Sequence, residues 1–191
     1  MSSGPIETNC QNLLNDIEKQ FNNPEISDVK IFCNENREIY VSSFILRARS
    51  SHFQKVLDSG MKESASKEIR IDSSYQVVES LFKYLYTDTL EASAKETLEI
   101  MMLADMYLLE GLRALCENKV KQSVTIHNAL DLFAWSKNCQ FRELCGFVTE
   151  FVWENFGCIS KTQEFEHILE HNLDLFKELL SKLPSTAKYS Y

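Results

Sequence analysis

The sequence predicts an α+β fold, a small sheet held among helices and followed by a smaller all-helical region. Two alternating apolar runs separated by a polar loop predict a β-hairpin over residues 29–41. A third, shorter strand is expected at Ile69 and Ile71. From Ser73 onward the apolar residues recur at helical spacing instead. A small local sheet combined with a helical remainder is typical of the α+β class.

The N-terminal segment, residues 1–25, is expected to form one amphipathic helix that Pro24 ends. Apolar side chains recur there at intervals of three and four residues, which places them in one stripe on a helix. The stripe is covered either by folding back onto its own domain or by a second copy of the chain. We expect the second arrangement, a homodimer. Its interface is expected to draw on Leu13, Leu14, Ile17 and Phe21.

A change of period marks the hairpin and the two helices after it. The hairpin loop is expected at Asn34 to Asn36, and Phe44, Ile45 and Ala48 then begin helical spacing. Ser51 and Gln54 have the spacing of a capping box, so a second short helix is expected to begin at Ser51. This helix carries three apolar residues, Phe53, Val56 and Leu57.

The rest of the chain is expected to be helical. Capping-box pairs mark two helix starts, Ser73 with Gln76 and Ser93 with Glu96. The pattern breaks near residues 123–126, which separates the region 26–122 from a smaller helical region, 123–183. Residues 184–191 are expected to form a flexible tail. Three apolar stripes are expected in the core: Val77, Val78, Leu81, Phe82 and Leu85; Leu98, Met101, Met102 and Leu108; and Leu112, Leu115, Cys116 and Val120.

Composition narrows the classes of function. A formal net charge of -8 over 191 residues argues against binding to the phosphate backbone of nucleic acids, which requires a basic face. No apolar run approaches the roughly 20 residues needed to cross a bilayer, and no N-terminal signal pattern is visible. We therefore expect no nucleic-acid or membrane partner and a cytoplasmic or nuclear location. Cysteines that lie within strand or helix patterns, Cys33, Cys116 and Cys145, are expected to be reduced core residues.

Several separated sequence words closely resemble the BTB/POZ family of protein-interaction domains. The words are "SDVKI" with Asp28, "ILRARSSHFQKVL", "YLYTDTL" and "LADMYLLEGLRALCE". This resemblance implies a BTB/POZ fold with a three-stranded sheet over residues 26–122, and the helices from Thr125 resemble the start of the BACK extension. The chain departs from the family at Ser42, where many members have His, and at Asp88, where Gly is common. These departures bear on any partner groove that such a His lines together with Asp28.

The resemblance also implies a function. Many BTB/POZ proteins bind the N-terminal domain of cullin-3 through a hydrophobic-x-Glu pattern, which Met61, Lys62 and Glu63 match. We expect a homodimeric adaptor that links an unidentified substrate protein to a cullin-3 ubiquitin ligase. The alternative is a dimerising scaffold or transcription-regulator domain that does not bind cullin. For Met61 itself, the alternative is that its side chain packs back on the helix ending near Leu57.

Catalytic motifs are weak. His167 and His171 match the H-x-x-E-H spelling and share a helix face, but a zinc hydrolase needs a third protein ligand and a cleft. Cys139, Cys145 and His127 lack the tight spacing of a structural zinc site. The glycines present form no phosphate-binding loop. We therefore expect no enzyme, no metal and no cofactor, with a zinc-dependent hydrolase as a remote alternative.

Overall fold

The computed structural model describes residues 5–59 and 65–182. The chain divides into two compact units between Lys119 and Val120. The N-terminal unit contains a three-stranded sheet among helices, and the C-terminal unit is helical. The α+β class expected from the sequence is therefore confirmed.

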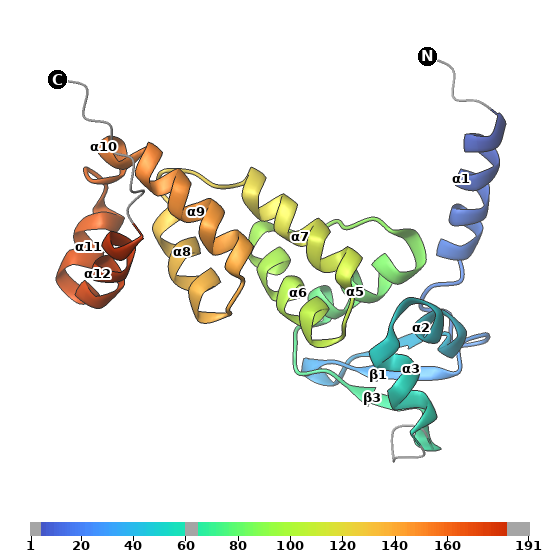
Figure 1. Ribbon diagram of the computed structural model, residues 1–191. Helices are drawn as coiled ribbons and strands as arrows, with labels where there is room; N and C mark the ends of the chain where they lie inside the picture. The colour runs from blue at the N-terminus through green and yellow to red at the C-terminus, as the bar shows by residue number, and fades with distance from the viewer. Residues whose placement is uncertain (1–4, 60–64, 183–191) are drawn as a thin grey trace. The chain divides into compact units, whose positions relative to one another are not determined.

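The N-terminal unit begins with a helix and a hairpin, and it ends with three longer helices. Its elements in order are α1 (Pro5–Glu18), β1 (Val29–Phe32), η1 (Asn34–Asn36), β2 (Glu38–Val41), α2 (Ser43–Arg49), α3 (Ser51–Asp58), β3 (Glu68–Arg70), α5 (Tyr75–Thr87), α6 (Ala94–Met106) and α7 (Glu110–Gln122). Figure 1 shows α2 and α3 on one side of the sheet.

The sheet has the strand order β2-β1-β3. β1 and β2 form the expected antiparallel hairpin, in which Ile31 lies opposite Ile39. β3 pairs with the other edge of β1 in the parallel direction, and Ile31 lies opposite Ile69 in this pair. These three isoleucines are neighbours in the ladder and all are buried, so they form one face of the core. A parallel pair needs a crossover connection, which here contains α2 and α3.

Two helix starts differ by one residue from the sequence expectation. The side chain that caps α3 belongs to Ser50 and accepts a hydrogen bond from the amide of Phe53, so Ser51 is the first helical residue. α5 is preceded by Ser74, while Ser73 is buried and donates instead to Glu99 at 2.5 Å. The capping box expected at Ser93 is confirmed, with both of its hydrogen bonds formed.

Two helix ends also differ from expectation. α1 ends at Glu18, so Phe21 lies in the turn that follows rather than on the helix. α6 ends at Met106, so Leu108 was wrongly assigned to its core stripe and is 53% exposed. Met102, which was assigned to the same stripe, lies on α6 but is 44% exposed, so that assignment was also wrong. Leu108 is in the left-handed region, φ 55°, and the amide of Leu109 donates to Ala104 O at 2.8 Å. This is a Schellman-type helix end, which turns the side chain of Leu108 out of the stripe.

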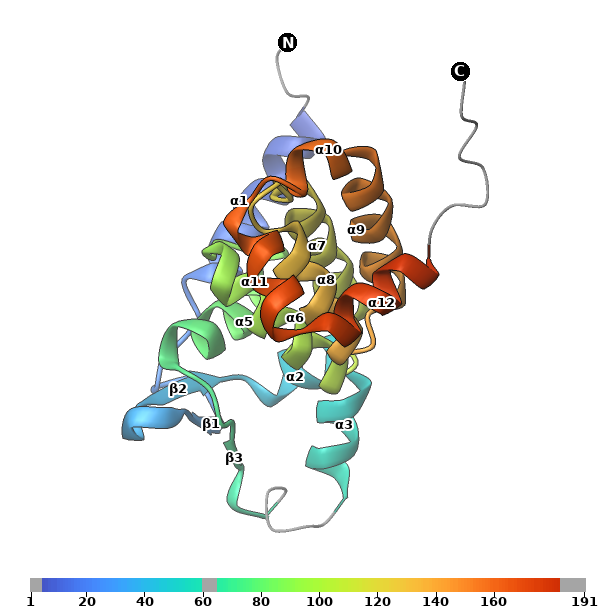
Figure 2. The same ribbon diagram turned by 90° about the vertical axis from the view of Figure 1, so that its left-hand side faces the viewer.

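The C-terminal unit continues with five helices: α8 (Ala129–Asn138), α9 (Arg142–Glu154), α10 (Phe156–Ile159), α11 (Gln163–His171) and α12 (Leu173–Ser181). Phe133, Leu144, Val148 and Val152 are fully buried and form its core. Figure 2 shows the C-terminal end of α12 beside α9. The tail expected over 184–191 lies outside the described residues.

Two expectations drawn from composition can be compared with the described residues. Cys33, Cys116 and Cys145 are buried and free, as expected for reduced core residues. No helix in the described part of the chain is long and apolar enough to cross a membrane.

Candidate docking surface

A groove lies between α3 and β3, the elements that precede and follow the hydrophobic-x-Glu segment in the sequence. Met61, Lys62 and Glu63 lie outside the described residues. The groove has a volume of about 500 Å³. Ser59 lines it at one end of the segment, and Ile69 and Arg70 line it after the other. The remaining lining residues are His52, Phe53, Lys55, Val56 and Tyr107.

Ser50 fixes the wall that α3 contributes to the groove. Its side chain is 2% exposed and makes two hydrogen bonds. The hydroxyl accepts from the amide of Phe53 at 3.2 Å, which caps α3, and donates to the carbonyl of Tyr107 at 2.8 Å. One buried side chain therefore fixes both the start of α3 and the backbone that carries the ring of Tyr107.

Aromatic rings form the floor of the groove. The centroids of Phe53 and Tyr107 are 5.0 Å apart, and those of His52 and Tyr107 are 5.2 Å apart. Phe53 also contacts Phe82 in the core, with centroids 5.6 Å apart. Burial raises the pKa of Tyr107, so its hydroxyl stays protonated at neutral pH. The floor is therefore apolar and continuous with the core.

The rim of the groove carries basic side chains. Lys55 comes from α3 and Arg70 from β3, where the Arg70 guanidinium lies 5.3 Å from the ring centroid of Phe32. Such a rim favours a partner that presents apolar groups next to carboxylates. Sequence reasoning singled out the motif but not Tyr107, Arg70 or Lys55, because residues from three distant elements meet here only in the folded chain.

Asp28, which carries part of the family resemblance, is held by its own chain. Its carboxylate accepts from the Ser43 amide at 2.7 Å, the Ser43 hydroxyl at 2.8 Å and Lys67 Nζ at 2.6 Å. Burial alone would raise the pKa of Asp28, but the hydrogen bonds from Lys67 and Ser43 outweigh it and lower the pKa to about 2. The amide of Ser42 donates to a different group, Tyr86 Oη, at 2.8 Å. Asp28 thus ties β1 to α2 and to the start of β3.

Asp88 replaces the glycine common in the family at the end of α5. It adopts φ 55°, a conformation that favours glycine and is tolerated by Asp and Asn. Its carboxylate forms an ion pair with Arg49, the last residue of α2. Arg49 also lies over the ring of Tyr84, 5.7 Å from its centroid. The ion pair offsets part of the conformational cost and links α2 to α5.

The four apolar residues expected at a dimer interface differ in how far their own chain covers them. Phe21 packs edge-on against Tyr86 of the same chain, with centroids 5.3 Å apart, and Glu18 pairs with Lys83 at 3.0 Å. Leu14 and Ile17 are half-buried, whereas Leu13 is 61% exposed. The homodimer therefore stays a prediction, with Phe21 contributing to its own domain and Leu13 free to contact a second copy.

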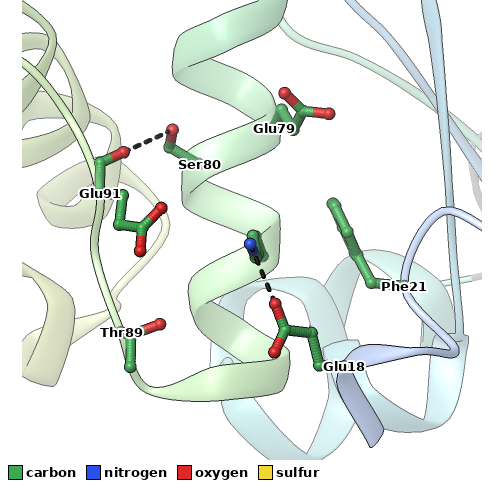
Figure 3. A pocket seen from close by; sticks show the side chains of 7 residues that line it. Glu18, Phe21, Glu79, Ser80, Thr89 and Glu91 are labelled. Atoms are coloured by element: carbon green, nitrogen blue, oxygen red, sulfur yellow. Dashed lines mark hydrogen bonds and ion pairs between the residues drawn. The ribbon is translucent and has the colours of Figure 1, made fainter. Parts of the chain in front are cut away.

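Figure 3 shows the pocket of 370 Å³ that forms where the end of α1 meets α5. Carboxylates dominate its lining, but Glu18 is neutralised by Lys83. Ser80 donates to the carbonyl of Glu91 at 3.3 Å, which holds the segment after α5 against the helix. The pocket is thus a polar contact region in which the ion pair between Glu18 and Lys83 holds the end of α1 against α5. Its lining residues are Glu18, Phe21, Glu79, Ser80, Lys83, Thr89 and Glu91.

The candidate metal ligands are not brought together into a site. His167 and His171 lie on α11 with stacked rings, 4.4 Å between centroids, and both are exposed. His127 pairs with Glu164 at 3.6 Å, whereas Cys145 is buried and contacts Lys182. Among the residues that the structure describes, no three His, Cys, Asp or Glu side chains are grouped to hold a metal.

Comparison with known proteins places the sequence in a family. A BTB/POZ domain model matches residues 17–124, which is more than half of the chain. The chain is 27% identical over 162 residues to the ARM repeat protein interacting with ABF2 of Arabidopsis thaliana, covering 84% of this chain and 23% of that protein. It is 25% identical over 159 residues to Kelch-like protein 8 of Caenorhabditis elegans, covering 83% and 22%.

The chain thus spans less than a quarter of the length of these two relatives. Among solved structures, the BTB domain of zebrafish PATZ1 matches with a TM-score of 0.51 at 20% identity, covering 64% of this chain and 100% of that one. At this level of identity the likeness shows the shared fold. The sequence match and the fold agree, and the chain belongs to the BTB/POZ family of protein-interaction domains.

Proposed function

We propose that this protein is a homodimeric adaptor that binds the N-terminal domain of cullin-3 and brings a substrate protein to the ligase. The observation that supports this proposal most is the position of the groove between α3 and β3. Its lining includes Ser59, immediately before the segment that contains Met61 and Glu63, and Ile69 shortly after it. The hydrophobic-x-Glu pattern and the groove can therefore contribute to one contact surface.

The chemistry of this surface suits protein binding rather than catalysis. Met61 would supply an apolar anchor for a pocket on cullin-3, and Glu63 would accept hydrogen bonds at the rim of the contact. His52 and Tyr107 form a floor that Ser50 fixes before binding, so little side-chain freedom is lost on association. Lys55 and Arg70 would meet acidic groups of the partner.

Dimerisation is supported by apolar side chains exposed in the N-terminal unit. Leu13 is 61% exposed and Phe44 is 76% exposed. Large apolar groups left in water favour burial against a second copy of the chain. A two-fold dimer carries two docking grooves, so one dimer would bring two ligase arms close to one substrate.

Size-exclusion chromatography with light scattering tests this function. The chain of 22.1 kDa is expected to elute as a dimer. Adding the purified cullin-3 N-terminal domain is expected to give a larger complex with one cullin domain per chain. A dimer that forms no complex would support the scaffold function instead, and a monomer that binds cullin would remove the dimeric arrangement from the proposal.

A further inference from the structure

A cysteine and a lysine meet in the C-terminal unit, where the end of α12 lies beside α9 (Figure 2). Cys145 Sγ on α9 and Lys182 Nζ, one residue past α12, are 3.3 Å apart although 37 positions separate them in the sequence. Cys145 is 6% exposed, so its thiol is almost fully shielded from water. A nucleophilic sulfur and a nucleophilic nitrogen are therefore held in direct contact.

Packing and hydrogen bonds hold the backbone on both sides of this contact. On the α9 side, the hydroxyl of Thr149 donates to the carbonyl of Cys145 at 2.6 Å. On the α12 side, the amide of Lys182 donates into the last turn of the helix, where Leu179 is 1% exposed. Lys182 Nζ also lies 5.1 Å from the ring centroid of Phe133 on α8. The contact between sulfur and nitrogen thus follows from the packing of α12 on α8 and α9.

One carboxylate completes the cluster. Glu178 Oε1 is 4.0 Å from Lys182 Nζ, and the same carboxylate forms an ion pair with Lys137 of α8. Because Glu178 is shared with Lys137, it neutralises Lys182 only in part. The ammonium next to Sγ can therefore serve as the countercharge of a thiolate, which is the form of cysteine that attacks an oxidant.

A groove of about 530 Å³ gives small molecules access to this pair. Lys182 is part of its lining, and so is Gly146, the residue that follows Cys145. A Cβ added at Gly146 would meet no neighbouring atom of the described chain within 4 Å, so the space there is open. A small hydroperoxide can enter this space, whereas the buried sulfur is closed to bulky reagents.

We propose that Cys145 and Lys182 form a covalent, reducible sulfur–nitrogen bond when the protein meets a hydroperoxide. The Cys145 thiolate attacks the outer oxygen of the hydroperoxide, the O–O bond breaks, and the Lys182 ammonium gives a proton to the leaving alkoxide. The sulfur has then lost two electrons to the peroxide and carries a sulfenic acid. Lys182 has become a neutral amine in contact with that sulfur.

The amine completes the reaction. Lys182 Nζ attacks Cys145 Sγ, the S–O bond breaks, and the departing hydroxide takes a proton from the nitrogen and leaves as water. One thiolate, one ammonium group and one hydroperoxide thus give one sulfenamide, one alcohol and one water; with hydrogen peroxide, the alcohol is a second water. Two molecules of a small thiol reverse the bond, because they restore the cysteine and the lysine and become a disulfide.

Proximity favours this bond over further oxidation of the sulfur. A sulfenic acid that finds no group with which to condense is oxidised on to a sulfinic acid. Here the amine already lies against the sulfur, so its effective concentration exceeds that of a second peroxide molecule. The bond would join α9 to the end of α12 and close a loop of 37 positions.

Mass spectrometry of the full chain in neutral solution tests the proposal. Serine replaces Cys10, Cys139 and Cys158, so that only the buried cysteines remain. Brief treatment with hydrogen peroxide is expected to lower the mass by about 2 Da, the two hydrogens lost in a sulfenamide, and dithiothreitol is expected to restore it. Fragments of the oxidised protein should join Cys145 to Lys182. A gain of about 32 Da at Cys145, which marks a sulfinic acid, would overturn the proposal.

Lysine variants separate this bond from a disulfide, which loses the same two hydrogens. Lys182→Arg keeps the charge but removes the amine, so the mass loss is expected to disappear and Cys145 is expected to reach the sulfinic acid. Lys177→Arg changes a lysine of the same helix whose side chain is 64% exposed, and this control is expected to react like the parent protein. Circular dichroism should show both variants folded. A mass loss that persists in Lys182→Arg, or that disappears in Lys177→Arg, would overturn the assignment.

Discussion

Ser50→Ala is expected to weaken the N-terminal unit more than its size suggests. Ser50 is 2% exposed, and its hydroxyl both caps α3 and donates to the carbonyl of Tyr107. Loss of a serine cap costs about 1 kcal/mol. Leaving the buried carbonyl of Tyr107 without its donor adds about 1–2 kcal/mol. We therefore expect a loss of about 2–3 kcal/mol in the free energy of unfolding.

Ser51→Ala is the matched control. Ser51 is exposed and lies one residue further along, where the sequence pattern places the cap. Its replacement is expected to change the free energy of unfolding by less than about 0.5 kcal/mol, as for other surface substitutions. Urea unfolding followed by circular dichroism measures both variants against the wild type. An equal or larger loss in Ser51→Ala would refute the assignment of the cap and the bridge to Tyr107.

Three further predictions follow from the same structure. Asp28→Asn is expected to lower the free energy of unfolding by about 1 kcal/mol at neutral pH, a value reduced because the carboxylate is 40% exposed. Since the pKa of Asp28 is lowered from 3.8 to about 2, its stabilisation is present above pH 3.8 and is lost as pH falls through 2. The free energies of unfolding of the two proteins, measured as a function of pH, should therefore converge in acid. Leu14→Asp combined with Ile17→Asp is expected to give a folded monomer by light scattering, and unfolded aggregate would mean that these residues serve the monomer core. Metal analysis of untagged protein is expected to give well under one equivalent of zinc, and stoichiometric zinc that is lost in His171→Ala would contradict the adaptor proposal.

The sequence pattern was sufficient for the strands and for most helices. Alternation placed β1 and β2 on either side of Asn34 to Asn36, because one face of the sheet is buried and the other is partly exposed. Alternation shows which side chains share a face but not which strand lies next to which. The parallel pairing of β3 with β1 was therefore not predictable, since it depends on the path of the chain through α2 and α3.

The errors at helix boundaries have tertiary causes. Ser51 has the stronger local capping signal because of its spacing to Gln54, but Ser50 caps the helix, and its hydroxyl also bonds to Tyr107, 57 positions away in the sequence. Leu108 continues the apolar pattern of α6 but falls in the left-handed turn that ends the helix. The docking groove combines residues of α3, β3 and the turn after α6, so the sequence pattern did not reveal it. The hydrophobic-x-Glu motif that the sequence does reveal lies outside the described residues.

The central claim is that the segment containing Met61 docks cullin-3, and calorimetric titration with the cullin-3 N-terminal domain tests it directly. An apolar anchor in a desolvated pocket contributes about 2 kcal/mol, so Met61→Ala is expected to weaken binding at least roughly tenfold. Met102→Ala, which removes a 44% exposed methionine that does not line the groove, is expected to bind like the wild type. Thermal melts should show both variants folded. Wild-type protein that does not bind at tens of micromolar would contradict the account, and equal binding by Met61→Ala would contradict the assigned site.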